Sequence, residues 1–260
     1  MNDQWTTIET TSPVDGVLLV RLNRPAQRNA LSAGLLKEVA QALLQAQSDP
    51  GVRAVVVTGN EKVFSAGADI KEMQKYGFDA LSNHERQAAW DAVAAFRKPV
   101  VAAVQGICFG GGLEFAMLAD IMIAGVGTVF GQPEITIGIL PGDGATQRLT
   151  RVVGKSLAMQ MIMTGEPVTA EVALRAGLVS EVVSVDSVVE RAVEIASVIA
   201  RRAPVALQLA KEAVLASYET ALSAGLTVER RAIRYAFTTR DQQEGMNAFV
   251  EKRAPEFLGH

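Results

Sequence analysis

The chain has 260 residues, of which 49% are hydrophobic, enough to bury a sizeable core as one large domain or as a domain with an appendage. Its net charge of −3 argues against a nucleic-acid binder, which usually carries a basic excess. The single cysteine, Cys108, allows neither an internal disulfide nor a cysteine-rich metal site, and we expect no bound metal.

The N-terminal segment, M-N-D-Q-W-T-T-I-E-T, is polar and acidic. It has neither the apolar core of a signal peptide nor the pattern of an Arg-rich amphipathic presequence. No apolar run is long and uninterrupted enough to span a bilayer. These features predict a cytoplasmic protein that does not enter a membrane.

The first hundred residues predict an opening of the order β-β-α-β rather than a simple alternation. Strands are expected at residues 16–22 and 52–58, and the segment from Asn29 to Ser32 is expected to start the helix between them, with Ser32 as its N-cap. A turn of small residues, F-S-A-G-A-D-I-K, follows the second strand. Residues 72–97 are mixed and polar and predict one helix packed on the core, with His84 as a surface histidine.

Residues 105–120 form the most informative stretch, Q-G-I-C-F-G-G-G-L-E-F-A-M-L-A-D. It follows an apolar strand pattern, breaks at three glycines, and resumes as a helix that carries Glu114 near its start. N–H groups at a helix start have no intrahelical partner and favour negative charge, and glycine lets such a backbone approach a ligand. A carboxylate beside this anion site is typical of an acid/base enzyme acting on a carbonyl. Cys108 is interpreted as a small buried hydrophobe.

The remaining chain predicts strands at residues 120–124 and 179–185 and helices at residues 156–164 and 169–177. Thr169 is the expected N-cap of the last of these helices, and Gly177 follows its end. From residue 187 onward the pattern is almost wholly helical. We therefore divide the chain into a catalytic α/β core over residues 1–186 and a helical C-terminal region over residues 187–260.

Two nucleotide-binding motifs fail on inspection. V-G-K-S at residues 153–156 resembles the end of a P-loop, but Leu149 stands where that motif needs a glycine. The triple glycine lacks the third glycine of a dinucleotide fingerprint, since Phe115 occupies its place. Taken singly, each glycine turn could serve only close packing, and Glu114 and Glu134 could be ordinary helix-start and loop carboxylates.

Four motifs in order, F-S-A-G-A-D-I-K-E-M, G-G-G-L-E-F-A-M-L-A-D, F-G-Q-P-E and L-P-G-D-G-A-T-Q-R-L, resemble those of the enoyl-CoA hydratase/isomerase (crotonase) superfamily. The resemblance covers nearly the whole chain. It implies an α/β fold, a crotonase-like spiral of ββα units, with a C-terminal helical region that mediates trimerisation. It also implies homotrimers that pair into hexamers, an acyl-CoA thioester as substrate, and no cofactor beyond the coenzyme A of that substrate.

The resemblance further assigns roles at the site. The N–H groups of Ala68 and Gly111 would form an oxyanion hole for the thioester carbonyl, and the backbone at Gly142 would support the site. Glu114 would hold and activate water, and Glu134 would protonate the α-carbon. Because both glutamates are present, the resemblance favours an enoyl-CoA hydratase, which adds water syn to trans-2-enoyl-CoA to give 3-hydroxyacyl-CoA.

Coenzyme A would lie along the first turn, near Ala66, Asp69, Ile70 and Lys71. Phe249 and Lys252 match positions that contact its nucleotide end from a neighbouring subunit. Lys71, Lys252 and Arg28 are candidate cations for its 3′-phosphate. One departure from the family pattern is Asp143, where many hydratases have a small neutral residue; we interpret it as an exposed turn aspartate.

Three other functions stay open at this point. An enoyl-CoA isomerase would move the double bond without water, and a hydratase–lyase would act on aromatic enoyl thioesters. A non-catalytic member of the same fold would bind a CoA thioester or RNA. The acidic charge and the two glutamates speak against the non-catalytic member. Acyl-chain length is not indicated by any motif.

Overall fold

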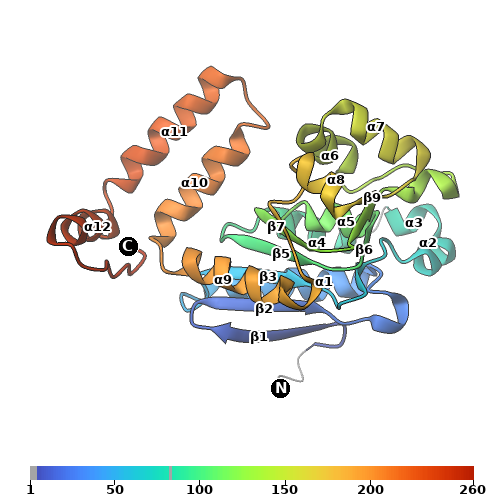
Figure 1. Cartoon of the computed structure of the whole chain (residues 1–260), viewed down its shortest axis with the longest axis horizontal. Coiled ribbons are helices and arrows are strands. Elements are labelled where there is room, and N and C mark those ends of the chain that lie inside the picture. Colours follow the sequence, from blue (N-terminus) through green and yellow to red (C-terminus); the bar gives the residue numbers. More distant parts are fainter. Residues whose placement is uncertain (1–4, 82–83) are drawn as a thin grey trace.

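The computed structural model describes residues 5–81 and 84–260, and two β-sheets form its centre (Figure 1). In this part of the chain the larger sheet has the spatial order β1 (Ile8–Val14), β2 (Val17–Leu22), β3 (Ala54–Thr58), β5 (Val100–Val104), β7 (Ile121–Gly125) and β10 (Glu181–Val183). β1 and β2 pair antiparallel, and the other neighbours are parallel. The smaller sheet contains β4 (Val63–Ser65), β6 (Ile107–Phe109), β8 (Val129–Gly131) and β9 (Val168–Thr169).

The two sheets are built from one repeating unit. The strands β3, β5 and β7 of the larger sheet are each followed by a strand of the smaller sheet, namely β4, β6 and β8. Each unit then continues into a helical segment, which is α2 (Ile70–Tyr76), α5 (Gly111–Ala116) or the 3-10 helix η2 (Pro133–Ile137). Successive units stack in parallel in both sheets. This arrangement confirms the predicted α/β spiral of ββα units.

Alternation of side chains explains why the larger sheet is covered on both faces. In β3 every residue is buried: Val55 and Val57 belong to one core cluster, whereas Ala54 and Val56 belong to the other. A strand buried on both faces reads as a continuous apolar run, as parallel sheets require. Two strands were predicted before the first helix, but no bounds were predicted for β1, which lies at the sheet edge and has mostly exposed residues.

Helix α1 (Ala33–Ser48) begins directly after the predicted N-cap. The Ser32 hydroxyl accepts a hydrogen bond from Leu35 N at 3.2 Å, which confirms this residue as the N-cap. Asn29, the first residue of the predicted start segment, lies outside the helix with a positive φ of 54°, and its amide nitrogen donates to the carbonyls of Val63 and Phe64. Its side chain therefore bonds to β4 and takes no part in the helix.

Residues 72–97 contain more helical segments than the single helix predicted. α2 begins after Asp69 and ends at Gly77, whose φ of 54° breaks the helix. α3 (Phe78–Leu81) and α4 (His84–Ala94) follow, and α4 packs against α1 through Ala89, Trp90 and Val93. His84 is exposed, as predicted.

The chain after the spiral is helical, and its caps follow the sequence. α6 (Ala145–Val153), α7 (Lys155–Thr164) and α8 (Ala170–Arg175) pack over the smaller sheet (Figure 1). Thr169 caps α8 through its hydroxyl, and Gly177 follows the C-cap with a φ of 79°. The last strand, β10, is shorter than the predicted 179–185.

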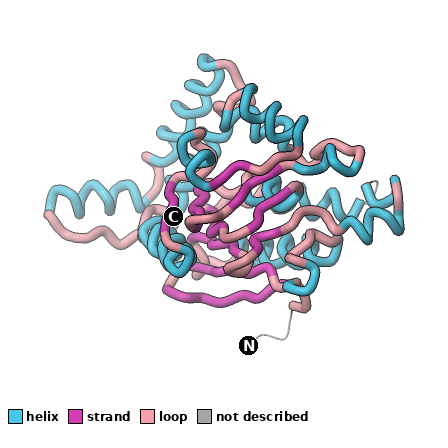
Figure 2. Tube along the Cα trace, turned by 45° about the vertical axis from the view of Figure 1, so that its right-hand side comes forward, coloured by secondary structure: helices cyan, strands magenta, loops and turns pink. Residues whose placement is uncertain are grey.

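The C-terminal region divides into a part that packs on the sheet and a part that extends from it. In α9 (Val188–Ala200), Val188 and three alanines spaced four residues apart bury one stripe against β2, β3, β5 and β7. α10 (Pro204–Ala216), α11 (Leu222–Ala236) and α12 (Arg240–Glu251) extend away from the strands (Figures 1 and 2). The division at residue 186 stays a prediction, but α9 belongs to the sheet by its packing. No helix among the described residues is long and apolar enough to cross a bilayer.

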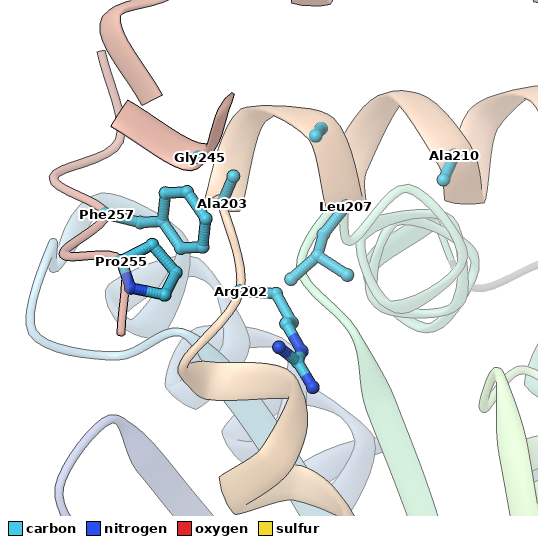
Figure 3. A pocket seen from close by; sticks show the side chains of 8 residues that line it. Arg202, Ala203, Leu207, Ala210, Gly245, Pro255 and Phe257 are labelled. Atoms are coloured by element: carbon cyan, nitrogen blue, oxygen red, sulfur yellow. The ribbon is translucent and has the colours of Figure 1, made fainter. Parts of the chain in front are cut away.

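The segment after α12 folds back along the extended helices. Asp241, at the start of α12, is buried, and its carboxylate accepts hydrogen bonds from Leu258 N at 2.7 Å and Gly259 N at 2.9 Å. A groove of about 420 Å³ is left between this segment, α10 and α12, lined mainly by apolar side chains such as Leu207 and Phe257 (Figure 3). None of the predicted site residues lines it.

The packing of α9 predicts that a larger side chain on its buried stripe is costly. We expect Ala196→Leu to lower the free energy of unfolding by about 1–3 kcal/mol, because the tightly packed sheet has no room for it. The measurement is urea-induced unfolding. Val198→Leu, on the exposed side of the same helix, is the control and should change it by less than about 0.5 kcal/mol. Equal effects of the two substitutions would show that α9 does not pack as described.

Candidate active site

Two turns leave the smaller sheet side by side. β4 and β6 are parallel neighbours, so the turns that follow them, at residues 66–69 and 110–112, emerge at the same edge. A methyl group added at Gly67 would lie 3.1 Å from Phe109 O, and one added at Gly111 would lie 3.5 Å from Ala68 N. Gly67 and Gly110 also have positive φ values of 108° and 52°. The small residues in both turns therefore serve a close approach of two backbones.

Two backbone N–H groups in these turns are available to a ligand. Neighbouring groups are paired: Leu31 N donates to Gly67 O at 2.8 Å, and Asp69 N donates to Leu31 O at 3.4 Å. Within the described chain, neither Ala68 N–H nor Gly111 N–H donates a hydrogen bond. The structure thus brings together the two donors predicted from the sequence.

A buried polar network holds the first turn in place. The Ser65 hydroxyl donates to Asn29 O at 2.8 Å and accepts a hydrogen bond from Gly67 N at 3.2 Å. Both Ser65 and Asn29 are fully buried. Sequence reasoning missed these two residues. Ser65 bonds to the carbonyl of Asn29, and Asn29 bonds to the carbonyls of Val63 and Phe64, more than thirty positions away, and no local pattern marks such contacts.

Glu114 lies on the buried side of α5, and only 2% of the residue is exposed. Its Oε1 atom accepts hydrogen bonds from Asp143 N at 2.8 Å and Ala145 N at 2.9 Å. Burial raises the pKa of this carboxyl to about 7, the two N–H groups oppose the rise, and the carboxylates of Asp143 and Glu134 add to it. Glu114 can therefore exchange a proton near neutral pH.

Glu134 opens the 3-10 helix η2 and faces the second glycine turn. A methyl group added at Gly110 would lie 2.8 Å from its Oε1 atom, which places the carboxyl group directly against that turn. With its amide NH₂ turned toward Glu134, the buried Gln132 donates to both carboxyl oxygens at 3.1 Å. Burial, together with the charge of Asp143, raises the pKa of Glu134, although its own N–H opposes this. Gln132 was also missed by sequence reasoning.

Asp143 corrects one expectation from the sequence. It is not an exposed turn aspartate: only 14% of its side chain is exposed, and it forms an ion pair with Arg86 of α4. The surroundings thus contain three carboxyl groups, Glu114, Glu134 and Asp143, and one of them is paired with a cation. The sequence could not indicate the pairing, because Arg86 lies 57 positions earlier in an ordinary helical pattern.

The turn at residues 141–144 supports Glu114 in a way that differs from the expected role of Gly142. The N–H groups that bind Glu114 belong to Asp143 and Ala145. Gly142 is exposed and makes no hydrogen bond to Glu114 within the described chain. Its part in the site therefore stays a prediction.

Comparisons with known proteins assign nearly the whole chain to one family. A family model described as enoyl-CoA hydratase/isomerase matches residues 13–260. The chain is 50% identical over 246 residues to a probable mitochondrial enoyl-CoA hydratase from Dictyostelium discoideum, covering 95% of this chain and 89% of that protein. The chain belongs to the enoyl-CoA hydratase/isomerase family.

Two further proteins show how far the likeness extends. The chain is 48% identical over 243 residues to the 2,3-dehydroadipyl-CoA hydratase of Escherichia coli, covering 94% of this chain and 95% of that protein. A crystal structure of an enoyl-CoA hydratase from Bacillus anthracis superposes with a TM-score of 0.93 at 38% identity, covering 98% of this chain and 100% of that one. The chain therefore matches the Escherichia coli protein in sequence and the Bacillus anthracis structure in fold, in both cases along nearly its full length.

The predicted coenzyme A residues of this family member are divided between two regions. Ala66, Asp69, Ile70 and Lys71 lie on the first turn and the start of α2. The carboxylate of Asp69 is already used, since it caps α2 and pairs with Arg24 at 3.0 Å, whereas Ile70 and Lys71 are exposed. Ala66 N donates to Arg28 O at 3.0 Å, which places the exposed Arg28 beside this turn.

Phe249 and Lys252 lie elsewhere in the same chain. They belong to the end of α12, on the opposite side of the molecule from α2 and α5 (Figure 1). The structure therefore does not bring them to the glycine turns of their own subunit. Phe249 is 85% exposed, so its ring is available to another surface.

Cys108 is fully buried in β6, and burial raises the pKa of its thiol, which confirms it as a small hydrophobe. In the described part of the chain, no three His, Cys, Asp or Glu side chains are grouped as a metal ion would need.

Burial of Glu114 predicts an unusual pH dependence of stability. Its pKa is about 7 in the folded chain and 4.5 without burial, so ionisation opposes folding increasingly between pH 4.5 and 7 and fully above pH 7. Glu114→Gln removes this cost while its oxygen still accepts both N–H groups. We expect the variant to be more stable than wild type at pH 8 by up to about 3 kcal/mol, and not at pH 4.

Glu38→Gln is the matched control and should show the opposite sign. Although partial burial raises the pKa of Glu38, hydrogen bonds from Thr6 and Thr7 lower it overall, so the carboxylate stabilises the fold above its ordinary pKa. This variant should lose stability at pH 7, and less of it at pH 4. The measurement is urea unfolding of all three proteins across this pH range. A Glu114→Gln difference that does not change with pH would contradict the burial argument.

Proposed function

We propose that this family member is an enoyl-CoA hydratase that adds water syn to a trans-2-enoyl-CoA to give the 3-hydroxyacyl-CoA. One observation carries the proposal: two glutamates with raised pKa values lie beside a pair of N–H groups that have no hydrogen-bond partner among the described residues. Relatives of 46–50% identity that are named enoyl-CoA hydratases support it.

The backbone donors of Ala68 and Gly111 would bind the thioester carbonyl oxygen. Attack on the β-carbon moves electrons through the conjugated system onto this oxygen, so negative charge grows there in the transition state. Donors fixed by the fold before the reaction stabilise that charge without reorganising, by about 3–4 kcal/mol for each donor. The close approach of the two turns would give this pair its geometry.

The two glutamates would divide the proton transfers of hydration. Glu114, as a carboxylate, takes a proton from water while the water oxygen bonds to the β-carbon. Glu134, as a carboxylic acid, gives its proton to the α-carbon as the enolate collapses. Before the next turnover the proton must pass back from Glu114 to Glu134. The pair therefore works with one shared proton, which its raised pKa values permit near neutral pH.

An isomerase would need only one of the two carboxyl groups. Moving a double bond transfers a proton between two carbons of the same substrate and adds no water, so one carboxyl group suffices. The hydrogen bonds that hold Glu114 would then have no catalytic use. Two glutamates at one site, Glu114 buried and Glu134 half-buried, favour the hydratase. Product analysis with a 3-enoyl-CoA separates the two reactions.

Removing either carboxyl group should abolish most of the activity. We expect Glu114→Gln and Glu134→Gln each to reduce the rate of crotonyl-CoA hydration by about 10²–10⁴-fold, because each loses one proton transfer. The measurement is loss of the conjugated-enoyl absorbance. Glu171→Gln, at an exposed position on α8, is the control and should leave the rate unchanged. A wild-type rate in either site variant would remove that glutamate from the mechanism.

The oxyanion hole can be tested by removing a donor from the backbone. Ala68→Pro deletes an N–H that has no partner in the described chain, so we expect it to spare folding while lowering kcat about 10²–10³-fold. Ala68→Gly keeps the N–H and should retain most of the activity. Thermal unfolding of both variants shows whether the fold is intact. An active, folded Ala68→Pro enzyme would contradict the assignment.

We further propose a homotrimer, probed here through the coenzyme A contacts. Large apolar side chains are exposed along the extended helices, including Leu222 (80%) and Tyr235 (61%), and such faces usually pack against a partner. Lys252 would then reach the nucleotide end of the substrate held by a neighbouring subunit, with Phe249 beside it. Lys71 and Arg28 would meet the same phosphates from the first turn. Pairing of trimers into hexamers is proposed on the family resemblance alone.

Subunit mixing tests this arrangement directly. We expect Lys252→Ala to raise KM about tenfold, or ~1.4 kcal/mol, by removing one phosphate contact. Its co-expression with the Glu114→Gln/Glu134→Gln double variant should restore sites of wild-type KM, because intact glutamates and an intact lysine then meet across the interface. Sedimentation of the wild type gives the oligomeric state. Absence of such restoration in mixed oligomers would place Lys252 outside the neighbour's site.

Two further properties remain proposals. The hydration described here uses only carboxyl and backbone N–H groups, so we propose that it needs no metal or redox cofactor; dialysis against a chelator should leave the rate unchanged. We also propose a cytoplasmic location. Fractionation of source cells is the test, since matching relatives include proteins named as mitochondrial as well as bacterial ones.

A further inference from the structure

Asp143 and Arg86 form a largely buried ion pair at the edge of the site. Arg86 Nη1 donates to Asp143 Oδ1 at 3.0 Å, and Arg86 Nη2 donates to Asp143 Oδ2. The two side chains are only 17% and 14% exposed. A guanidinium that donates two parallel hydrogen bonds fixes both the position and the orientation of a carboxylate.

The backbone of Asp143 is bonded to the catalytic machinery at the same time. Its N–H donates to Glu114 at 2.8 Å, and its carbonyl accepts a hydrogen bond from Arg148 Nη1 at 3.1 Å. A methyl group at Gly144 would lie only 2.0 Å from that Arg148 nitrogen, so this glycine makes room for the guanidinium. The turn that holds Glu114 is therefore itself held by two arginines.

Arg86 is in turn fixed by the packing of α4. Its guanidinium lies 5.8 Å from the centre of the Trp90 ring, and that ring meets Phe115 edge-on at 6.4 Å. Phe115 is the neighbour of Glu114 on α5. α4 is anchored on α1 through the hydrophobic core. The ion pair thus connects a rigid helix to the turn that binds Glu114.

We propose that Asp143 is a positioning residue of the hydration site, held by Arg86, and that this ion pair sets the pH range over which the two glutamates share their proton. The proposal rests on the proposed hydratase function. It concerns a motif position at which the sequence analysis found a departure from the family pattern.

The charges around the two glutamates explain why the ion pair should set the pH range over which they share a proton. Glu114 faces Asp143 from the turn and Glu134 from η2, while Arg86 on α4 and Arg148 on α6 contact Asp143. Asp143 raises the pKa of both glutamates. Arg86 compensates its charge. Removing the charge of Asp143 leaves the positive charge of Arg86 uncompensated beside the shared proton and lowers the pKa of the glutamates. Removing Arg86 leaves the negative charge of Asp143 uncompensated and raises it.

The test is the pH dependence of kcat/KM in a double-mutant cycle. Asp143→Asn keeps an acceptor for Arg86 but removes the negative charge, so the pH-rate profile should move to lower pH by about one unit. Arg86→Gln should move it to higher pH by a similar amount. The double variant should return close to the wild-type profile. Asp143→Ala, which also releases the turn, should in addition lower kcat at least tenfold with little change in KM.

A purely structural role gives a different pattern. If both single variants move the profile in the same direction, or if neither moves it, the proposal is overturned. The titration of Glu114 can also be followed without turnover, from the stability difference between each protein and its Glu114→Gln derivative across pH. If the pH dependence of this stability difference shifts in opposite directions in the two single variants, the proposal is supported. That holds even if wild type hydrates no enoyl thioester, a result that would overturn only the proposed function. Equal shifts in the two variants overturn the pairing argument.

Discussion

The close approach of two glycine turns is the constraint on which the rest of the site depends. Ala68 N–H and Gly111 N–H can face one ligand atom only if the turns after β4 and β6 come within van der Waals contact. The parallel pairing of these strands provides the approach, and the absence of a side chain at Gly67 permits it, because a methyl group there would lie 3.1 Å from Phe109 O. The strand register and the missing side chain of Gly67 therefore bring the two donors close to each other.

The same repeat places the acid/base groups. Each unit of the spiral ends in a helical segment at one edge of the smaller sheet, so α5 and η2 follow neighbouring strands and carry Glu114 and Glu134 to the same place. Neither glutamate is attached to a flexible loop. Glu114 is held by the turn before α6, and Glu134 by Gln132. Rigid support of this kind matters because a proton transfer requires short, fixed distances.

The sequence predicted best those features that are determined locally. Buried parallel strands such as β3 are apolar runs, and the caps at Ser32 and Thr169 are chemical signals at fixed offsets. The glycine turns and glutamates were found because their motifs occur in order along the chain. The bounds of edge strand β1 were not predicted, because its residues carry no apolar alternation.

Features that depend on distant partners could not be predicted in this way. Asn29 was placed in the segment that starts a helix, because its bonds to Val63 and Phe64 are invisible in the local pattern. Asp143 was assigned to the surface for the same reason, since only the fold brings Arg86 to it. An ion pair between residues 57 positions apart leaves no spacing signal in a single sequence. A family motif identifies the position but says nothing of a residue that departs from it.

The site lowers the stability of the folded chain, and packing elsewhere in the fold offsets this loss. A glutamate whose pKa is about 7 in the folded chain opposes folding at neutral pH by about 3 kcal/mol, a large share of the 5–15 kcal/mol by which domains are usually stable. The larger sheet, covered on one face by α9 and on the other by the main core cluster, offsets this through burial of apolar area. The positive charge of Arg86 offsets the negative charge of Asp143, whose carboxylate adds to the rise in the pKa of Glu114. The carboxyl groups proposed for catalysis are therefore also the groups that lower the stability of the fold, and Arg86 neutralises the additional carboxylate of Asp143 beside them.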